Sequence, residues 1–402
     1  MVLVCATMWW PLSARLSMAL IAHGCRVSAV CPPGHPLRYI SGVEAVYPYR
    51  GLGSIESLRK AIATSQPDLI VPGDDGVVWQ LHELHAKVPE LRGLIEKSLG
   101  SSEGYATIRS RGAFLQRAAE IGIRVPDTRT IASESDLNYL AENEPSVLKL
   151  DGTWGGSGVA IARSKAEAVA AFRKLSQPMG IGTSCKRFLV NRDPLALWSW
   201  GKRERPRVTA QQFVSGRPAN TMFACWEGEV LGIVTVEVLA AQGSTGAATV
   251  VRIVRNGEIE TAARLLAKEL KLSGFHGLDF MIENSTGAAY LIELNPRCTQ
   301  LGHLPVAGQG DLAGLIAARL SGVAAVMPCK DECIQGDTVA FFPQTFTWNP
   351  ASVYLVRGYH DVPWEEPELV RQLIKKPWPE RQWLSRVYHH FRVTKRQDEV
   401  RF

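Results

Sequence analysis

The chain contains 402 residues, 46% of them hydrophobic and 21% charged, a composition typical of a globular protein with two or three domains. The net charge of +6 is modest for this length, and no aromatic and basic recognition motif accompanies it, so we expect no nucleic-acid partner. The eight cysteines form no CxxC pair, which argues against a zinc site or a disulfide framework and indicates a reducing, cytoplasmic environment.

The first 104 residues predict a small α/β domain with a doubly wound parallel sheet, because strand-like and helix-like segments alternate along them. The expected strands are Val2–Ala6, Arg26–Cys31 and Asp68–Pro72, and the expected helices are Pro11–His23 and Ile55–Thr64. Met1–Gly24 is apolar, but it lacks a basic start and Arg15 interrupts it, so we expect a strand and a helix rather than a signal peptide. No GxGxxG follows the first strand, which gives little support to a nicotinamide or flavin site.

The third strand of this domain ends in Pro72-Gly-Asp-Asp75. Open α/β sheets bind ligands beyond the carboxyl ends of their strands, which makes Asp74 and Asp75 substrate-binding candidates. A solvated turn is the alternative.

Four glycines lie in the segment Asp151-Gly-Thr-Trp-Gly-Gly-Ser-Gly158, directly after a strand expected over Ser146–Leu150. Glycine permits positive-φ turns that let backbone N–H groups approach phosphate oxygens, and Lys149 closes the strand beside them. The segment is not a Walker A loop, because the lysine precedes the glycines. It predicts a phosphate-binding loop, with a flexible hairpin turn and a surface lysine as the alternative.

Antiparallel strands and helices around and after this loop predict an α+β unit. The strands are expected over Val208–Val214, Ala219–Trp226 and Val230–Val238, and the helices over Arg111–Ile121 and Glu258–Lys271. The apolar residues of the last helix recur at helical spacing, which indicates core packing rather than a site.

The segment Gly277–Arg297 predicts a β-hairpin with strands over Leu278–Glu283 and Ala289–Leu294. If residue 283 pairs with residue 289, Asp279 lies opposite Glu293, and Asn295 shares the face of Glu293. Two carboxylates and an amide oxygen are ligands that suit Mg²⁺, and Arg297 on the same face can meet developing negative charge. An ordinary hairpin with carboxylates in water is the alternative.

Together, the order and spacing of these motifs resemble the ATP-grasp superfamily, most of all the ATP-grasp halves of carbamoyl-phosphate synthetase large chains. Lys149 precedes Thr153-Trp-Gly-Gly-Ser-Gly158, and Asp279 lies fourteen positions before Glu293-Leu-Asn-Pro-Arg297. The resemblance covers about residues 1–320. It implies an N-terminal pre-ATP-grasp domain over 1–104, an ATP-grasp domain over 105–330 with a small lobe at about 120–212 and a large lobe at about 213–330, and a C-terminal appendage over 331–402.

The resemblance implies a nucleotide site on the small lobe. Arg111 would be the first basic contact to ATP, and Lys149 would bind on the side of the α-phosphate. The loop residues Gly155 and Gly156, with Ser157 beside them, would close over the triphosphate.

Two departures from the family pattern concern the adenosine part of the nucleotide. The hinge from Gln212 to Val214 would hold the adenine, with Gln212 where the family usually has glutamate. Ala219 stands where a ribose-binding acid is usual, so either Asn220 substitutes for it or the ribose contact is lost.

On the hairpin, the resemblance implies that Asp279 and Glu293 ligate Mg²⁺, with Asn295 completing a second metal and Mn²⁺ as an alternative ion. Arg297 would be catalytic and stabilise the transferring phosphoryl group. The implied activity is a ligase that activates a carboxylate as an acyl phosphate for attack by an amine or another nucleophile, with release of ADP and phosphate. Alternatives are an ATP-binding protein without turnover and a carboxylase-like or kinase-like member. The expected partners are a small-molecule carboxylate and an amine.

The C-terminal region is basic: residues 371–402 contain nine lysines and arginines against three acids. Trp383, Val387 and Phe391 share one helical face. We expect this face to pack on the ATP-binding lobe, with contact to an anionic membrane surface, short of stable insertion, as the alternative. His360 and Asp361 are expected to be structural rather than substrate-binding.

Overall fold

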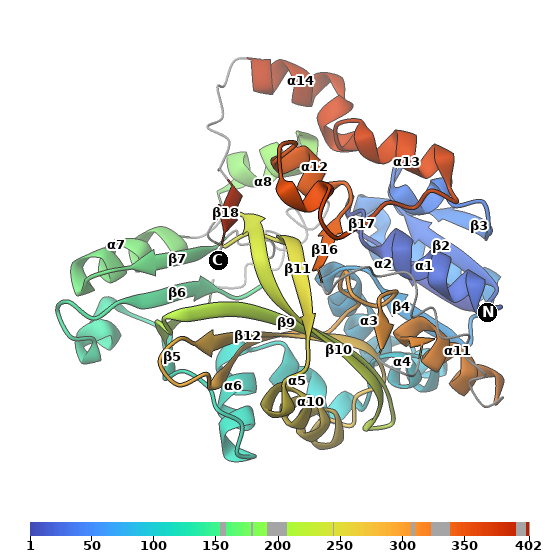
Figure 1. Ribbon diagram of the computed structural model, residues 1–402. Coiled ribbons are helices and arrows are strands. Elements are labelled where there is room, and N and C mark those ends of the chain that lie inside the picture. The colour runs from blue at the N-terminus through green and yellow to red at the C-terminus, as the bar shows by residue number, and fades with distance from the viewer. Residues whose placement is uncertain are drawn as a thin grey trace.

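The computed structural model describes residues 1–152, 158–177, 180–190, 207–243, 245–306, 310–322, 338–390 and 399–401. These residues form an N-terminal domain, a small antiparallel lobe and a large lobe built on a long curved sheet (Figure 1). The predicted combination of an α/β domain with a two-lobed α+β core is confirmed.

The N-terminal domain has a parallel four-stranded sheet in the order β3-β2-β1-β4. Its elements are β1 (Val2–Cys5), α1 (Ser13–Ala22), β2 (Val27–Cys31), η1 (Pro36–Tyr39), β3 (Val43–Pro48), η2 (Gly51–Gly53), α2 (Ser54–Ser65), β4 (Leu69–Pro72), α3 (Asp75–Lys87), η3 (Pro89–Leu91) and α4 (Arg92–Leu99). Val2 and Val4 pack in the core beside α1, whereas Leu3 and Cys5 pack in the core of α2, α3 and α4. Helices therefore cover both faces, as predicted for a doubly wound sheet.

The small lobe is an antiparallel sheet in the order β5-β8-β6-β7 that carries α7 on one face. The segment that leads into it and its own elements are η4 (Ser102–Gly104), α5 (Tyr105–Ile108), α6 (Arg111–Glu120), β5 (Thr128–Ile131), η5 (Glu134–Tyr139), β6 (Ser146–Leu150), β7 (Val159–Ala162), α7 (Lys165–Leu175), α8 (Ile181–Leu189) and β8 (Val208–Gln212). Leu148 and Ala210 face α7. Because side chains alternate along a strand, Lys149 lies on the opposite face, which is turned toward the large lobe.

The large lobe is an eight-stranded sheet in the order β13-β12-β9-β10-β11-β16-β17, with β18 paired to β10. Its elements are β9 (Gly216–Trp226), β10 (Glu229–Gln242), β11 (Ala248–Val254), α10 (Gly257–Glu269), β12 (Gly274–Glu283), β13 (Ala289–Asn295), β14 (Pro305–Val306), β15 (Gly310–Asp311), α11 (Leu312–Ser321), β16 (Thr338–Phe341), α12 (Gln344–Trp348), η6 (Val353–Leu355), β17 (Tyr359–Asp361) and β18 (Glu399–Arg401). Strands β16 and β17 lie beyond residue 330, so part of the expected appendage completes this sheet.

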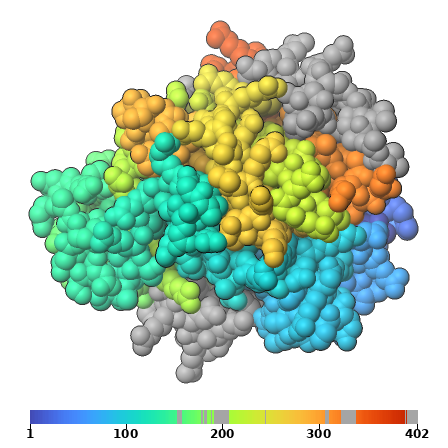
Figure 2. Space-filling view, turned by 90° about the horizontal axis from the view of Figure 1, so that it is seen from below, coloured from blue at the N-terminus to red at the C-terminus, as the bar shows by residue number. Residues whose placement is uncertain are grey.

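Different helices cover the two faces of the large sheet. Phe280 packs with Phe114 of α6 and Leu266 of α10 on one face, and Met222 packs with α1 and α11 on the other. Seen from below, α10 lies between the small lobe and the N-terminal domain (Figure 2). The hairpin β12-β13 is thus fixed at the place where all three parts of the molecule meet.

The remaining helices of the C-terminal region are α13 (Pro367–Ile374), η7 (Trp378–Arg381) and α14 (Trp383–His390). Leu369 and Leu373 anchor α13 in the main core. The expectation that the face of Trp383 and Val387 packs on the ATP-binding lobe is wrong, because these side chains are 67% and 39% exposed. Phe391 lies outside the described residues. No helix among the described residues is both long and apolar enough to cross a membrane.

Candidate active site

The hairpin β12-β13 brings Asp279 and Glu293 to directly opposite positions, as predicted. The register behind this pairing differs from the assumed one, since Ala289 pairs with Ile282 rather than with residue 283. A bulge at Ile292 accounts for the difference: Phe280 pairs with Leu291, and Asp279, one residue earlier, pairs with Glu293. Bulges re-aim side chains next to sites. Here Leu291 enters the core while Glu293 faces the cleft.

Asp279 is the most constrained carboxylate of the site. The amide of Asn220 donates to one of its oxygens at 2.6 Å, and the amide of Asn295 donates to the other at 3.1 Å. Burial and the nearby Glu293 carboxylate raise the pKa of Asp279 above its usual range, although the two amides oppose the shift. The carboxylates of Asp279 and Glu293 repel one another, and a cation bound between them would relieve this repulsion.

Lys149 projects from the small lobe toward these carboxylates. Its side chain is almost fully buried, and burial lowers its pKa to about 8, while Glu293 and Asp279 act in the opposite direction. No carboxylate among the described residues forms an ion pair with the Lys149 ammonium that would offset its desolvation. A buried lysine of this kind is suited to an anionic ligand that enters the cleft.

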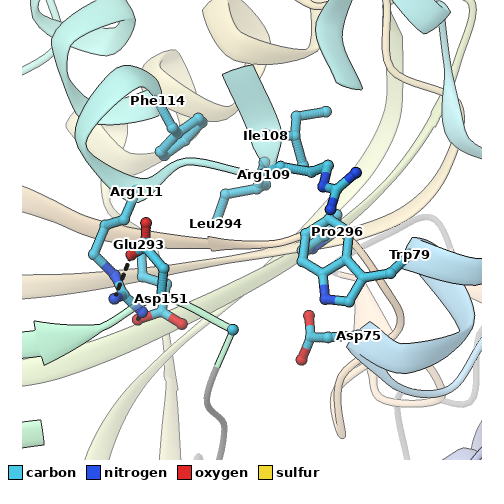
Figure 3. Close-up of a pocket in the computed structure, with 11 residues that line it drawn as sticks. Asp75, Trp79, Ile108, Arg109, Arg111, Phe114, Asp151, Glu293, Leu294 and Pro296 are labelled. Atoms are coloured by element: carbon cyan, nitrogen blue, oxygen red, sulfur yellow. Dashed lines mark hydrogen bonds and ion pairs between the residues drawn. The ribbon is translucent and has the colours of Figure 1, made fainter. Parts of the chain in front are cut away.

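Arg111, at the first position of α6, bridges the two lobes (Figure 3). Its guanidinium donates to Glu293 at 3.0 Å and to Asp151 at 3.2 Å. Asp151 follows strand β6 directly, so the same arginine contacts the start of the glycine-rich segment and strand β13. Burial raises the pKa of Asp151, and Arg111 opposes this shift.

Arg297 is held from the N-terminal domain. Its Nε donates to Asp75 at 3.0 Å, and one of its terminal nitrogens donates to Asn295 at 3.3 Å. Burial alone would lower the pKa of Arg297, but Asp75 raises it overall. Asp74 has a different role, because it caps α3 by accepting from Val77 and also accepts from Thr7. Of the two candidate aspartates, Asp75 lies at the site and Asp74 supports the fold.

A pocket opens between these groups (Figure 3). Asp75 and Trp79 of α3 line one side of it, and Arg111, Asp151 and Glu293 line the other. The lining therefore comes from the N-terminal domain, from α6, from the small lobe and from the hairpin.

The structure does not bring every predicted residue to this cleft. Gly155, Gly156 and Ser157 lie outside the described residues. The side chain of Gln212 is exposed and lies on the α7 face of β8, opposite to the face of Lys149. Gln211, which the sequence did not single out, is buried on the Lys149 face, where it donates to Thr128 at 3.2 Å.

Three further predicted positions are placed as follows. Val214 is buried after the end of β8. Ala219 is fully buried in the core beneath α6 and α10, so it does not face the cleft. Asn220 does face the cleft, but its amide is engaged by Asp279.

Sequence reasoning did not single out Asp151, Gln211 and Trp79 as site residues. The positions of Trp79 and Gln211 within their elements could have indicated them. Trp79 lies one helical turn after Asp75, and Gln211 pairs with Val147, which shares the face of Lys149. The ion pair of Asp151 joins residues far apart in the sequence, and no local pattern reveals it.

The donor set fits Mg²⁺ bound together with a phosphate ligand. Among the described residues, no group of three His, Cys, Asp or Glu side chains forms a metal cage. Asp279, Glu293 and Asn295 instead supply two carboxylates and an amide, and Mg²⁺ is commonly held by one or two carboxylates plus substrate phosphates. A cation there would also offset the charge that raises the pKa of Asp279.

The described residues thus define a class: a two-lobed protein with a cleft that combines oxygen ligands, a buried lysine and two arginines. The family model of the ATP-grasp domain matches residues 113–300. The chain therefore contains an ATP-grasp domain.

The relatives of the chain share about a quarter of its residues where they align. The carbamoyl phosphate synthase large chain of Rubrobacter xylanophilus is 26% identical over 310 residues, which cover 75% of this chain and 27% of that protein. The chain therefore spans about a quarter of the length of the curated relatives it matches.

Solved structures share the fold at lower identity. An L-amino acid ligase from Bacillus licheniformis has a TM-score of 0.54 at 15% identity, with 79% of this chain and 74% of that chain covered. The biotin carboxylase domain of the Hydrogenobacter thermophilus 2-oxoglutarate carboxylase, crystallised with MgADP, ADP and bicarbonate, has a TM-score of 0.57 at 14% identity, with 82% and 71% covered.

Proposed function

We propose that the protein is an ATP- and Mg²⁺-dependent ligase that activates a carboxylate as an acyl phosphate for attack by an amine or another nucleophile. The observation that carries the proposal is the pairing of Asp279 with Glu293 on the hairpin, faced by the buried Lys149 of the other lobe. The MgADP bound to the related carboxylase domain supports the same choice of nucleotide and metal. The proposed ligase reaction is ADP-forming.

Phosphoryl transfer demands positioning and charge neutralisation more than a nucleophilic side chain. Asp279, Glu293 and Asn295 would hold the metal, which would neutralise the charge of the phosphates. Lys149 donates to the phosphates, and Arg111 supplies a second cation between the lobes.

The reaction then follows from the chemistry of the substrates. A carboxylate oxygen attacks the γ-phosphorus while the bond from that phosphorus to the bridging oxygen breaks, and ADP leaves. The amine attacks the acyl carbon, and phosphate leaves with the electron pair of the acyl–oxygen bond. Arg297, oriented by Asp75, stabilises the charge on the transferring phosphoryl group.

A nucleotide-binding protein without turnover is the second candidate. It is favoured by one observation: Ala219 faces the core and position 220 carries an amide whose nitrogen donates to Asp279, so neither position offers the ribose a carboxylate. The identity of the acid and of the nucleophile is open in both candidates.

The test is release of ADP from Mg·ATP across a panel of carboxylate and amine pairs. The ligase predicts ADP and phosphate only when a matching pair is present. Glu293→Gln should abolish this turnover, because it weakens the metal site, and it should leave the circular dichroism spectrum unchanged. Calorimetric binding of Mg·ATP without ADP formation from any pair would support the binding protein instead.

A further inference from the structure

Helix α14 differs from a typical surface helix, because its apolar side chains are exposed and a polar side chain is buried. Its polar residue Ser385 is buried, whereas Trp383, Leu384 and Val387 are 67%, 38% and 39% exposed. These three apolar residues fall within one stripe of the helix, since they are one and four positions apart. The helix therefore turns its apolar face away from the protein.

The side of α14 that faces the protein makes a cation–π contact with α8. Lys186 of α8 lies 4.6 Å from the centre of the Tyr388 ring. Figure 1 shows α14 at the outer edge of the molecule, near α8 and away from the large sheet. We call the exposed side chains of Trp383, Leu384 and Val387 the α14 face.

The segment of the chain that carries the α14 face is basic. Residues 371–390 contain five lysines and arginines against one acid, Glu380. No acidic residue lies within α14 itself. An exposed tryptophan with aliphatic neighbours and a basic surrounding is typical of helices that lie in the interface of an anionic bilayer.

We propose that the α14 face docks on an anionic phospholipid surface, with Trp383, Leu384 and Val387 entering the headgroup boundary and the basic residues around them contacting lipid phosphates. The charge favours this partner over a second copy of the chain. A symmetric contact through the α14 face would bring two basic segments together, which is repulsive. The proposal does not depend on the ligase activity.

The experiment is co-sedimentation of the whole protein with vesicles of phosphatidylcholine alone and with vesicles of equal parts phosphatidylcholine and phosphatidylglycerol. We expect binding to the anionic vesicles and little to the neutral ones. The double variant Trp383→Ser, Val387→Ser should weaken anionic binding about tenfold or more, through lost apolar contact. The double variant Lys375→Glu, Lys376→Glu should weaken it by a similar factor, since each basic residue near such a surface contributes about fivefold.

Leu52→Ser is the matched control, because Leu52 is 84% exposed on η2 of the N-terminal domain. It should bind as the unchanged protein does. The proposal is overturned if neutral and anionic vesicles bind equally, if the α14 variants bind as the control does, or if light scattering shows a dimer that the Trp383→Ser, Val387→Ser variant loses while no vesicle binds. Unchanged melting temperatures of all variants show that folding is not the cause.

Discussion

At the scale of single residues, Lys149 is in an environment that disfavours its own charge. Burial lowers its pKa to about 8 from 10.5, more than Glu293 and Asp279 can restore. Between these two pH values the folded, ligand-free protein binds fewer protons than the unfolded chain, so this residue makes stability rise with pH there. ATP phosphates bound beside Lys149 would favour its charged ammonium form and so raise its pKa.

We therefore predict that Mg·ATP binding takes up a proton slightly above pH 8. Calorimetry in two buffers of different ionisation enthalpy measures the proton, because the apparent binding enthalpies then differ. Lys149→Met is the control that should bind with no uptake and with a loss of about 1.5–3 kcal/mol, the range for a hydrogen bond to a charged group. Uptake that persists in this variant would assign the proton to another group.

Arg111 donates to the carboxylate of Glu293, one of the proposed metal ligands. The same guanidinium is expected to contact phosphate in the complex, so it acts in opposite directions on the two ligands. Arg111→Gln should bind Mn²⁺ alone more tightly, because Glu293 loses its internal partner, and should bind Mg·ATP more weakly by about 1.5–3 kcal/mol. Titration of Mn²⁺ followed by electron paramagnetic resonance, and calorimetry with Mg·ATP, measure the two effects. Equal losses for both ligands contradict the exchange.

At the scale of elements, the sequence predicted the hairpin and its pair of carboxylates but not the geometry that joins them. A strand with regular alternation would put Leu291 and Glu293 on one face. The bulge at Ile292 sends them to opposite faces, and no glycine marks it. The same dependence on register separates Gln211 from Gln212, since a shift of one residue exchanges the two faces of a strand.

The start of α3 meets the end of the hairpin through Asp75 and Arg297. This contact crosses between two parts of the molecule, so we expect it to orient the arginine rather than to bind nucleotide. Asp75→Asn should lower kcat about 10- to 100-fold, the range for a side chain that orients a catalytic group. Its dissociation constant for Mg·ATP should stay the same.

The control for this positioning role is Asp75→Glu, which keeps the charge and should recover part of kcat. Rate assays and calorimetry on the same preparations separate the two quantities. A weaker affinity for Mg·ATP in Asp75→Asn, with kcat unchanged, would show that Asp75 belongs to the nucleotide site.

At the scale of the whole molecule, local patterns predicted the succession of parts but not how the end of the chain returns to the beginning. Strands β16 and β17 carry few residues; β16 pairs with β11, where Val250 lies ninety positions before its partner Ala340, and β17 pairs with β16. Asp361 at the end of β17 accepts from Arg15 of α1 at 2.6 Å and contacts His303 at 2.8 Å. One buried carboxylate thus ties together the N-terminal domain, the segment after the hairpin and the C-terminal region.

This ion cluster leads to a prediction on stability. Burial alone would raise the pKa of Asp361, but His303 and Arg15 lower it overall. A lowered carboxylate pKa stabilises the fold above the unfolded value of about 4, and this contribution is lost as the pH falls through the folded value. Asp361→Asn removes the charge and leaves the largely buried guanidinium of Arg15 without its carboxylate, so it should destabilise the protein at neutral pH by about 3–5 kcal/mol.

Urea unfolding of the full chain, followed by circular dichroism from neutral to acidic pH, measures this effect. The difference between the natural protein and Asp361→Asn should shrink as the pH falls from about 4, where the unfolded chain begins to protonate Asp361, to the lowered folded pKa, below which Asp361 is protonated in both states. Glu44→Gln is the comparison, because Glu44 pairs with Arg26 on the surface, where solvent screens the charges. The midpoint of Glu44→Gln should match that of the natural protein. If Asp361→Asn also leaves the midpoint unchanged at neutral pH, the three parts are held together by their apolar contacts and not by this carboxylate.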